Sequence, residues 1–184
     1  KRFSEICNTL FGDRCFIITD KEKVKTWNFE DWYPVTKEET KLFWNEFCAT
    51  ENVWETLEPI DDSAGWNYFK DMIIGVPNIN VYFITSRAKT SGRSVMKQSI
   101  NWLKKQGWLD PQVIVSSEKS KLINDLQLDF FVDDMPETII DVRDNCKSCK
   151  MYRFDYPFNR HIENVVKVDS LREYTDYIRM YIKQ

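Results

Sequence analysis

From residue 80 to the C-terminus, short apolar stretches alternate with stretches of helical spacing. Residues 80–85, NVYFIT, are apolar and β-branched, and residues 94–106 then repeat apolar side chains at helical spacing up to Gly107. Further strand-like stretches occupy residues 112–117, 130–132 and 150–154, and helix-like stretches begin at residues 119, 134 and 170. Strands that alternate with helices indicate βαβ units, so the sequence predicts an α/β fold with a mostly parallel sheet flanked by helices.

Three helix starts are marked by capping sequences. Thr36-Lys-Glu-Glu39 and Ser170-Leu-Arg-Glu173 are capping boxes, in which the hydroxyl and the glutamate satisfy backbone N–H groups. Asp134-Met-Pro-Glu137 combines an acidic residue, an early proline and a glutamate. We therefore expect Asp134 to cap the helix that follows it.

The first third of the chain has a different character. Residues 1–11 have helical spacing, residues 12–35 are irregular and rich in aromatic side chains, and the capping box at residue 36 opens another helix. We interpret residues 1–62 as mainly a small helical and aromatic cap, and residues 63–184 as the α/β core. Packing is the commoner role for such aromatic side chains, but they can also stack on a ligand, and the sequence leaves both roles open.

Composition excludes several classes of function. The net charge is −3, from 26 basic and 29 acidic residues, and no basic face stands out, so we expect no nucleic-acid partner. No apolar run approaches the roughly 18–20 residues that span a bilayer, so we expect no membrane partner. Hydrophobic residues make up 42% and aromatic residues 15% of the chain, which indicates a folded core.

The five cysteines are odd in number and scattered, which is not the pattern of a disulfide framework and favours a cytoplasmic, reducing location. Cys146-Lys-Ser-Cys149 has the spacing of half a zinc site or of a redox pair. A tetrahedral zinc site needs about two more ligands, and the chain has one histidine and no second pair of this spacing. Free thiols in a loop are therefore the favoured interpretation.

Polar side chains follow three of the predicted strands. The first strand ends in Thr85-Ser86-Arg87, the second is followed by Lys119, and the third ends in Asp133-Asp134. Ligands of open α/β sheets bind outside the carboxyl ends of the strands, so these side chains should converge at one edge. Hydroxyl and ammonium groups suit phosphate, and paired carboxylates suit Mg²⁺. The sequence therefore predicts a phosphate and magnesium site.

Each of these features alone has a more ordinary explanation. A hydroxyl pair at a strand end is usually a turn, a lysine near a helix start is usually solvated, and adjacent aspartates are often a cap. Their order also matters. Phospho-acceptor signalling domains use similar groups but place the acid pair on the first strand, whereas this chain has the order Thr85, Lys119, Asp133-Asp134.

The stretches VYFITSR (81–87) and SSEKSKLINDLQLDFFVDD (116–134) resemble motifs two, three and four of the haloacid dehalogenase (HAD) superfamily of phosphohydrolases. The chain is most similar to the cytosolic type C 5'(3')-deoxyribonucleotidase branch. WETLEPI (54–60) resembles the segment where the cap rejoins the core, and YRFDYPFNR (152–160) resembles a late strand with its Pro-x-Asn turn. The resemblance spans nearly the whole chain and is strongest over residues 79–160.

This resemblance implies a role for each residue of the predicted site. Thr85 would be the phosphate-binding hydroxyl, and Ser86 would help to hold the phosphate or the sugar edge. Lys119 would neutralise the phosphoryl group and the nucleophile, so Thr85 and Lys119 would both act in catalysis and contact the same anion. Asp133 and Asp134 would hold Mg²⁺ directly or through water, which would make two adjacent like charges tolerable.

The implied function is Mg²⁺-dependent hydrolysis of phosphomonoesters, as a 5'-nucleotidase acting on (deoxy)nucleoside monophosphates through an aspartyl-phosphate intermediate. The superfamily's Asp-x-Asp motif, which supplies the nucleophile, does not occur in the sequence. We expect the nucleophile to lie upstream of Lys1. A non-catalytic relative that binds nucleotide or phosphate without this motif is the alternative.

In the superfamily, the strand that carries the nucleophile lies between the strands that correspond here to residues 81–84 and 130–132. We expect a strand to fill this place, because otherwise the facing backbone groups lack partners. Residues upstream of Lys1 are the first candidate. Residues 15–19 are the second, because an apolar run there ends in Asp20-x-Glu22.

Overall fold

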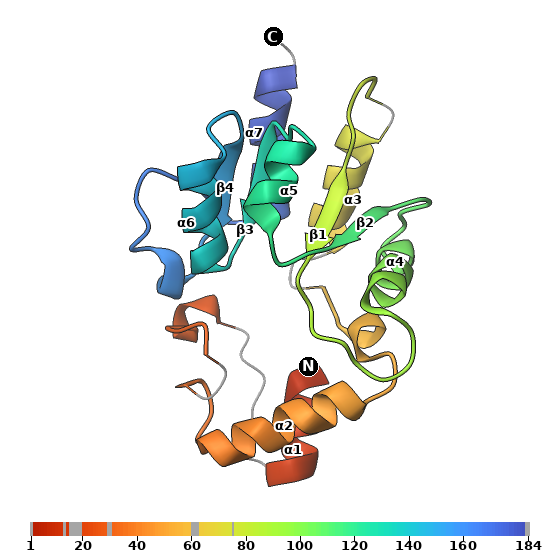
Figure 1. Cartoon of the computed structure of the whole chain (residues 1–184), viewed down its shortest axis with the longest axis vertical. Helices are drawn as coiled ribbons and strands as arrows, with labels where there is room; N and C mark the ends of the chain where they lie inside the picture. Colours follow the sequence, from red (N-terminus) through yellow and green to blue (C-terminus); the bar gives the residue numbers. More distant parts are fainter. Residues whose placement is uncertain are drawn as a thin grey trace. The chain divides into compact units, whose positions relative to one another are not determined.

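The computed structural model describes residues 2–12, 14, 20–28, 31–59, 63–74 and 76–182 (Figure 1). The chain divides into two compact units. The first unit contains residues 1–58 and 82–115, and the second contains residues 59–81 and 116–184. These units group the chain differently from the expected cap (1–62) and core (63–184), and that division stays a prediction.

The first unit combines helices with a parallel strand pair. Its elements are α1 (Arg2–Phe11), the 3-10 helix η1 (Lys21–Lys23), α2 (Lys37–Ala49), the 3-10 helix η3 (Val53–Thr56), β1 (Tyr82–Thr85), α4 (Val95–Lys105) and β2 (Gln112–Val115). In the strand pair, Tyr82 lies beside Gln112 and Thr85 beside Val115. Helix α4 packs against β2 and against η3. The helices predicted near residues 1–11, 36–47 and 94–106 and the strands at 80–85 and 112–117 are confirmed.

Capping fixes where two of these helices begin. Thr36 Oγ1 accepts from the Glu39 backbone N–H, and the Glu39 carboxylate accepts from the Thr36 N–H, so the predicted capping box is present at α2. The Ser94 side chain likewise accepts from the Lys97 N–H at the start of α4. The same helix ends before Gly107, whose φ of 88° is a left-handed conformation that glycine adopts without strain.

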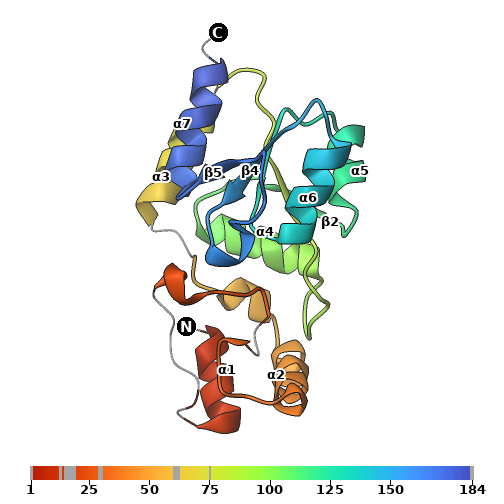
Figure 2. The ribbon, with the colours of Figure 1, turned by 90° about the vertical axis from the view of Figure 1, so that its left-hand side faces the viewer.

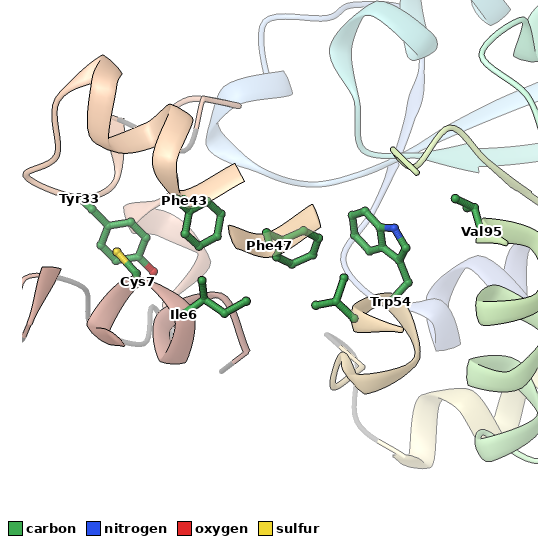
Figure 3. Packing of buried hydrophobic residues seen from close by; sticks show 8 residues of the cluster. Ile6, Cys7, Tyr33, Phe43, Phe47, Trp54 and Val95 are labelled. Atoms are coloured by element: carbon green, nitrogen blue, oxygen red, sulfur yellow. The ribbon is translucent and has the colours of Figure 1, made fainter. Parts of the chain in front are cut away.

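The core of the first unit is an aromatic cluster (Figure 3). Phe43 and Phe47, one turn apart on α2, are fully buried, and the Phe47 ring lies 4.8 Å from that of Trp54 in η3. Each such side chain contributes roughly 1.5–3 kcal/mol on burial. Of the aromatic side chains between residues 12 and 35, Tyr33 is buried in this cluster and Trp32 packs against it, whereas Trp27 is 44% exposed, so packing accounts for part of that set.

The second unit is a three-stranded parallel sheet with helices on both faces. Its elements are α3 (Ser63–Ile73), α5 (Lys119–Asp125), β3 (Phe130–Asp133), α6 (Pro136–Asn145), β4 (Lys150–Phe154), the 3-10 helix η4 (Pro157–Asn159), β5 (Val166–Val168) and α7 (Leu171–Ile182). The strand order is β3-β4-β5. Helices α3 and α7 pack together on one face, and α5 and α6 on the other (Figure 2).

The helical layers of the second unit contribute its buried side chains. Ile139 and Val142 of α6 are fully buried, and Tyr152 of β4 packs edge to face on Tyr174 of α7 at 5.3 Å. The predicted elements from residue 119 onward are confirmed. At the start of α7, Ser170 Oγ accepts from the Glu173 N–H as expected, but the Glu173 carboxylate accepts from the Asp169 N–H.

One strand and one α-helix were not predicted. Strand β5 has only three residues, and only Val168 is buried, so the sequence shows no alternation of apolar and polar residues there. Helix α3 buries Phe69 and Ile73, and the sequence analysis did not single out its residues as a helix.

The described strands form two separate sheets. Among the described residues, β1 pairs only with β2, and β3 pairs only with β4. The direct pairing of β1 with β3 that would contradict the expected strand order is therefore not formed. Residues 15–19, the internal candidate for the strand between them, lie outside the described residues. That a strand fills this place stays a prediction.

Cys7 departs from the expected pattern of cysteines, because it is disulfide-bonded. Cys48, Cys146 and Cys149 are free. The number and spacing of the cysteines gave no signal for the disulfide of Cys7. No helix in the described parts of the chain has the length and apolar character to cross a membrane.

Candidate functional site

Asp133 is the last residue of β3, and both of its carboxylate oxygens have partners. Oδ1 accepts from the backbone N–H groups of Asp134 and Met135, each at 2.9 Å, and Oδ2 lies 2.5 Å from Lys119 Nζ. The prediction that Asp134 caps α6 is wrong. Met135 occupies the cap position and makes no side-chain cap hydrogen bond. Asp133 instead binds two of the N–H groups that lead into α6, because the chain turns there directly after β3.

The predicted pair of Lys119 and Asp133 is brought together. Lys119 opens α5, and its side chain is 11% exposed, while that of Asp133 is 9% exposed. Away from water the attraction between the two charges is strong, and the two N–H donors complete the coordination of the carboxylate. The helix and strand that separate the two residues in sequence thus return the chain to the same point of the sheet.

Asp134, next to this ion pair, is half-buried and less well compensated. Burial and, after it, the negative charge of Asp133 together raise its pKa to about 6, against smaller lowering effects of a backbone hydrogen bond and of Lys119. A carboxyl group of this pKa holds a proton for part of the time near neutral pH. A cation bound beside it would keep it ionised.

The donor set fits Mg²⁺ on chemical grounds. Asp133 and Asp134 offer hard carboxylate oxygens, and the charge of Asp134 lacks a full counter-charge. Mg²⁺ typically binds one or two carboxylates and completes its shell with water and substrate phosphate. No group of three or more His, Cys, Asp or Glu side chains gathers in the described part of the chain, so the fit depends on such outer ligands.

Thr85, Ser86 and Arg87 follow one another at the carboxyl end of β1. Thr85 ends the strand and is half-buried, Ser86 is exposed, and the Arg87 guanidinium lies over the indole of Trp54 at 5.0 Å. These residues belong to the first unit, whereas Lys119 and the two aspartates belong to the second. That Thr85 and Lys119 meet at one anion stays a prediction.

A buried residue behind Asp134 was missed by the sequence analysis. Asn159 is fully buried in the Pro-x-Asn turn, and its Nδ2 donates to the backbone carbonyls of Asp134, at 3.0 Å, and Phe154, at 2.8 Å. Its Oδ1 accepts from Arg153 Nη1, at 2.8 Å, and from the Tyr156 N–H, at 3.2 Å. All four hydrogen-bonding positions of the amide are used, so it ties the turn to the backbone of Asp134.

An ionic network supports Asn159. Arg153, which lies beside Asp133 in the sheet register, binds the Asp155 carboxylate at 2.8 Å. Arg160 binds the other Asp155 oxygen at 2.7 Å. Burial acts to raise the pKa of Asp155, but the hydrogen bonds from Arg160 and Arg153 outweigh it and lower the pKa. Asp155 is therefore a stable carboxylate at neutral pH that holds Arg153 against the Asn159 amide.

The Cys146–Cys149 pair lies beside a cavity of about 280 Å³ that also touches Lys150 and Val166. These residues begin β4 and β5, so the cavity lies at the amino ends of the strands, opposite the end that carries Asp133. Burial raises the pKa of both thiols, that of Cys149 to about 12. The thiolate that metal binding and redox chemistry need is disfavoured, which supports the interpretation as free thiols.

A family model described as "5' nucleotidase, deoxy (Pyrimidine), cytosolic type C protein" matches residues 1–184. No curated protein and no solved structure matches the chain. The family match extends through the N-terminal region, where the motif resemblance was loose, and agrees with the resemblance of the strand-end motifs.

Proposed function

Because the chain belongs to the cytosolic type C 5'-nucleotidase family of HAD-like phosphohydrolases, we propose that it is a Mg²⁺-dependent phosphomonoesterase acting on (deoxy)nucleoside 5'-monophosphates. The observation that carries the proposal is the buried contact of Lys119 with Asp133, next to the undercompensated Asp134. It places one cation and two carboxylates at the carboxyl end of a parallel strand, where α/β sheets bind ligands. We further propose that the protein acts in the cytoplasm on small molecules.

In this mechanism the residues of the chain bind and neutralise the phosphate. The Thr85 hydroxyl donates to a phosphoryl oxygen, and Ser86 holds the phosphate or the sugar edge. Lys119 supplies positive charge that favours the negative charge developing on the phosphoryl group. Its buried contact with Asp133 holds the ammonium group in place, so that little reorganisation is needed when substrate binds.

Asp133 and Asp134 would hold the metal, with Asp133 oriented by its two backbone N–H donors. Bound Mg²⁺ would supply further charge stabilisation and orient the phosphate. Asn159 fixes the backbone of Asp134 from behind. We propose that the nucleophile is an aspartate upstream of Lys1. It attacks phosphorus and breaks the ester P–O bond, so that the nucleoside leaves with a proton and an aspartyl-phosphate forms; water then releases inorganic phosphate and restores the aspartate.

A non-catalytic relative that binds nucleotide without turnover is the second candidate. It is favoured by one observation, the lack of an Asp-x-Asp motif in the sequence. Both candidates use Thr85 and Lys119 for phosphate, and they differ only in whether phosphate is released.

The deciding experiment measures the release of inorganic phosphate from a panel of phosphomonoesters. The panel contains deoxy- and ribonucleoside 5'-monophosphates, a 3'-monophosphate and a sugar phosphate. The chain of 184 residues is compared with one extended upstream to include an Asp-x-Asp motif, each with Mg²⁺ and with EDTA. The enzyme proposal expects Mg²⁺-dependent release from 5'-monophosphates by the extended chain. Nucleotide binding without release by either chain would establish the non-catalytic alternative.

A further inference from the structure

Arg87, two residues beyond Thr85, is a half-buried cation without an acidic partner. Its guanidinium lies 5.0 Å from the centre of the Trp54 ring, and Nη1 donates a long hydrogen bond of 3.4 Å to Ser99 Oγ. No carboxylate of the described residues forms an ion pair with it. Burial lowers the pKa of Arg87, and no neighbouring negative charge offsets this effect.

Two other basic side chains of this unit, unlike Arg87, bind oxygen atoms of Glu55. Arg93, in the same loop, binds the buried Glu55 carboxylate at 2.8 Å, and Asn101 donates to the other oxygen of that carboxylate. Lys105 donates to the Glu55 backbone carbonyl at 3.0 Å. Both oxygens of the buried Glu55 carboxylate therefore already have partners, and Arg87 does not bind this carboxylate. Buried charges in proteins are normally paired, so a half-buried guanidinium without a carboxylate partner is suited to bind an external anion.

The surroundings of Arg87 are held in place. The Trp54 indole N–H donates to the Ala88 carbonyl at 2.9 Å, and the Trp54 backbone N–H donates to Gln98 Oε1 at 3.0 Å. Gln98, fully buried, also donates to Thr90 Oγ1 and to the Arg93 carbonyl. Figure 3 shows the Trp54 ring between Phe47 and Val95, anchored in the core of the first unit.

The donors of Arg87 are available to a ligand. Among the described side chains, no nitrogen of Arg87 is both fully buried and without a hydrogen-bond partner. The unpaired N–H groups of Arg87 therefore reach solvent, while its stem lies against Trp54. A preordered guanidinium of this kind binds phosphate through two parallel hydrogen bonds and loses little side-chain freedom on binding.

We propose that Arg87 binds the phosphate group of the substrate beside Thr85. The identity of the anion rests on the proposed function, whereas the need for an anion rests on the geometry around Arg87 alone. The ligand class is a phosphomonoester dianion, and inorganic phosphate is its simplest probe.

The test compares Arg87→Met with Arg93→Met in thermal unfolding and phosphate titration. Methionine keeps an unbranched apolar stem against Trp54 and removes the charge. We expect Arg87→Met to unfold at the same temperature as the parent chain or higher in the absence of phosphate, and to bind phosphate about tenfold more weakly. Arg93→Met should unfold at a lower temperature, because Glu55 loses its partner, with unchanged phosphate affinity. Chloride at matched ionic strength controls for screening.

The outcomes separate this inference from the proposed function. If the parent chain and Arg87→Met bind phosphate equally well, Arg87 is not part of the site and the proposed function stands. If Arg87→Met loses as much thermal stability as Arg93→Met and keeps its phosphate affinity, Arg87 is a packing residue and the inference is overturned. If the parent chain binds neither phosphate nor nucleoside monophosphates, both the inference and the proposed function fail.

Discussion

Replacing Asn159 with alanine tests how strongly the Pro-x-Asn turn supports the site. The side chain is fully buried and makes four hydrogen bonds, to Asp134, Phe154, Arg153 and Tyr156. Alanine removes all four and leaves two carbonyls and one N–H group without these partners. Arg153 keeps its bond to Asp155.

The magnitude follows from these contacts. A buried polar group that loses its partner costs about 1–3 kcal/mol, and water that enters the space left by the amide recovers part of this. We therefore expect the free energy of unfolding to fall by about 3–5 kcal/mol. That loss is a large fraction of the roughly 5–15 kcal/mol by which domains are stable.

The assay is urea unfolding monitored by circular dichroism, with Asn145→Ala as the matched control. Asn145 is exposed and its side chain makes one hydrogen bond, to Asp141. The control should change the free energy of unfolding by no more than about 0.5 kcal/mol. If Asn159→Ala is no more destabilising than Asn145→Ala, the four bonds do not hold the turn and the reasoning is wrong.

Three further predictions concern the acids and the lysine. Lys119→Met should lower the free energy of unfolding, measured in urea, by about 3–5 kcal/mol, because Asp133 is left charged and buried. The control Lys167→Met removes a lysine from an exposed ion pair and should have no measurable effect. Asp133→Asn in a chain extended upstream should abolish Mg²⁺-dependent phosphate release while circular dichroism shows a retained fold; normal activity would refute its role as a metal ligand. With Mg²⁺ chelated, the Asp134 pKa of about 6 predicts that stability falls as pH rises from about 4 to 6, because the native state keeps a proton that the unfolded state releases. Asp134→Asn should remove this decline in urea unfolding across that range, and an unchanged decline would contradict the assignment.

Local signals in the sequence predicted most of the elements but not all of them. The capping box at Thr36 and the β-branched stretches that became β1 and β2 depend on neighbouring residues alone, so they could be read directly. Strand β5 could not be predicted in this way, because three residues with one buried side chain are too few to show the alternation of apolar and polar residues. Its place in the sheet is set by pairing with β4, which is a tertiary contact.

The site shows the same division between local and tertiary information. The approach of Lys119 to Asp133 was predictable, since one helix and one strand separate them and parallel strands bring their carboxyl ends together. The role of Asn159 was not predictable. Its side chain binds backbone groups of Asp134, Phe154 and Tyr156, and the sequence does not single out those groups. The lack of a counter-ion for Arg87 likewise emerges only once Glu55 is found bound to Arg93.

The two adjacent aspartates at the end of β3 have different electrostatic environments. Asp133 ends β3 and Asp134 lies in the turn that leads into α6, so the two carboxyl groups meet different protein partners. Lys119 and two backbone N–H groups bind the Asp133 carboxylate, whereas burial and, after it, the charge of Asp133 raise the pKa of Asp134. A divalent cation bound here would be attracted by both carboxylates, but it would offset an uncompensated burial of charge only at Asp134. The affinity of the pair for Mg²⁺ should therefore depend on pH through Asp134, while Asp133 and Lys119 fix the geometry.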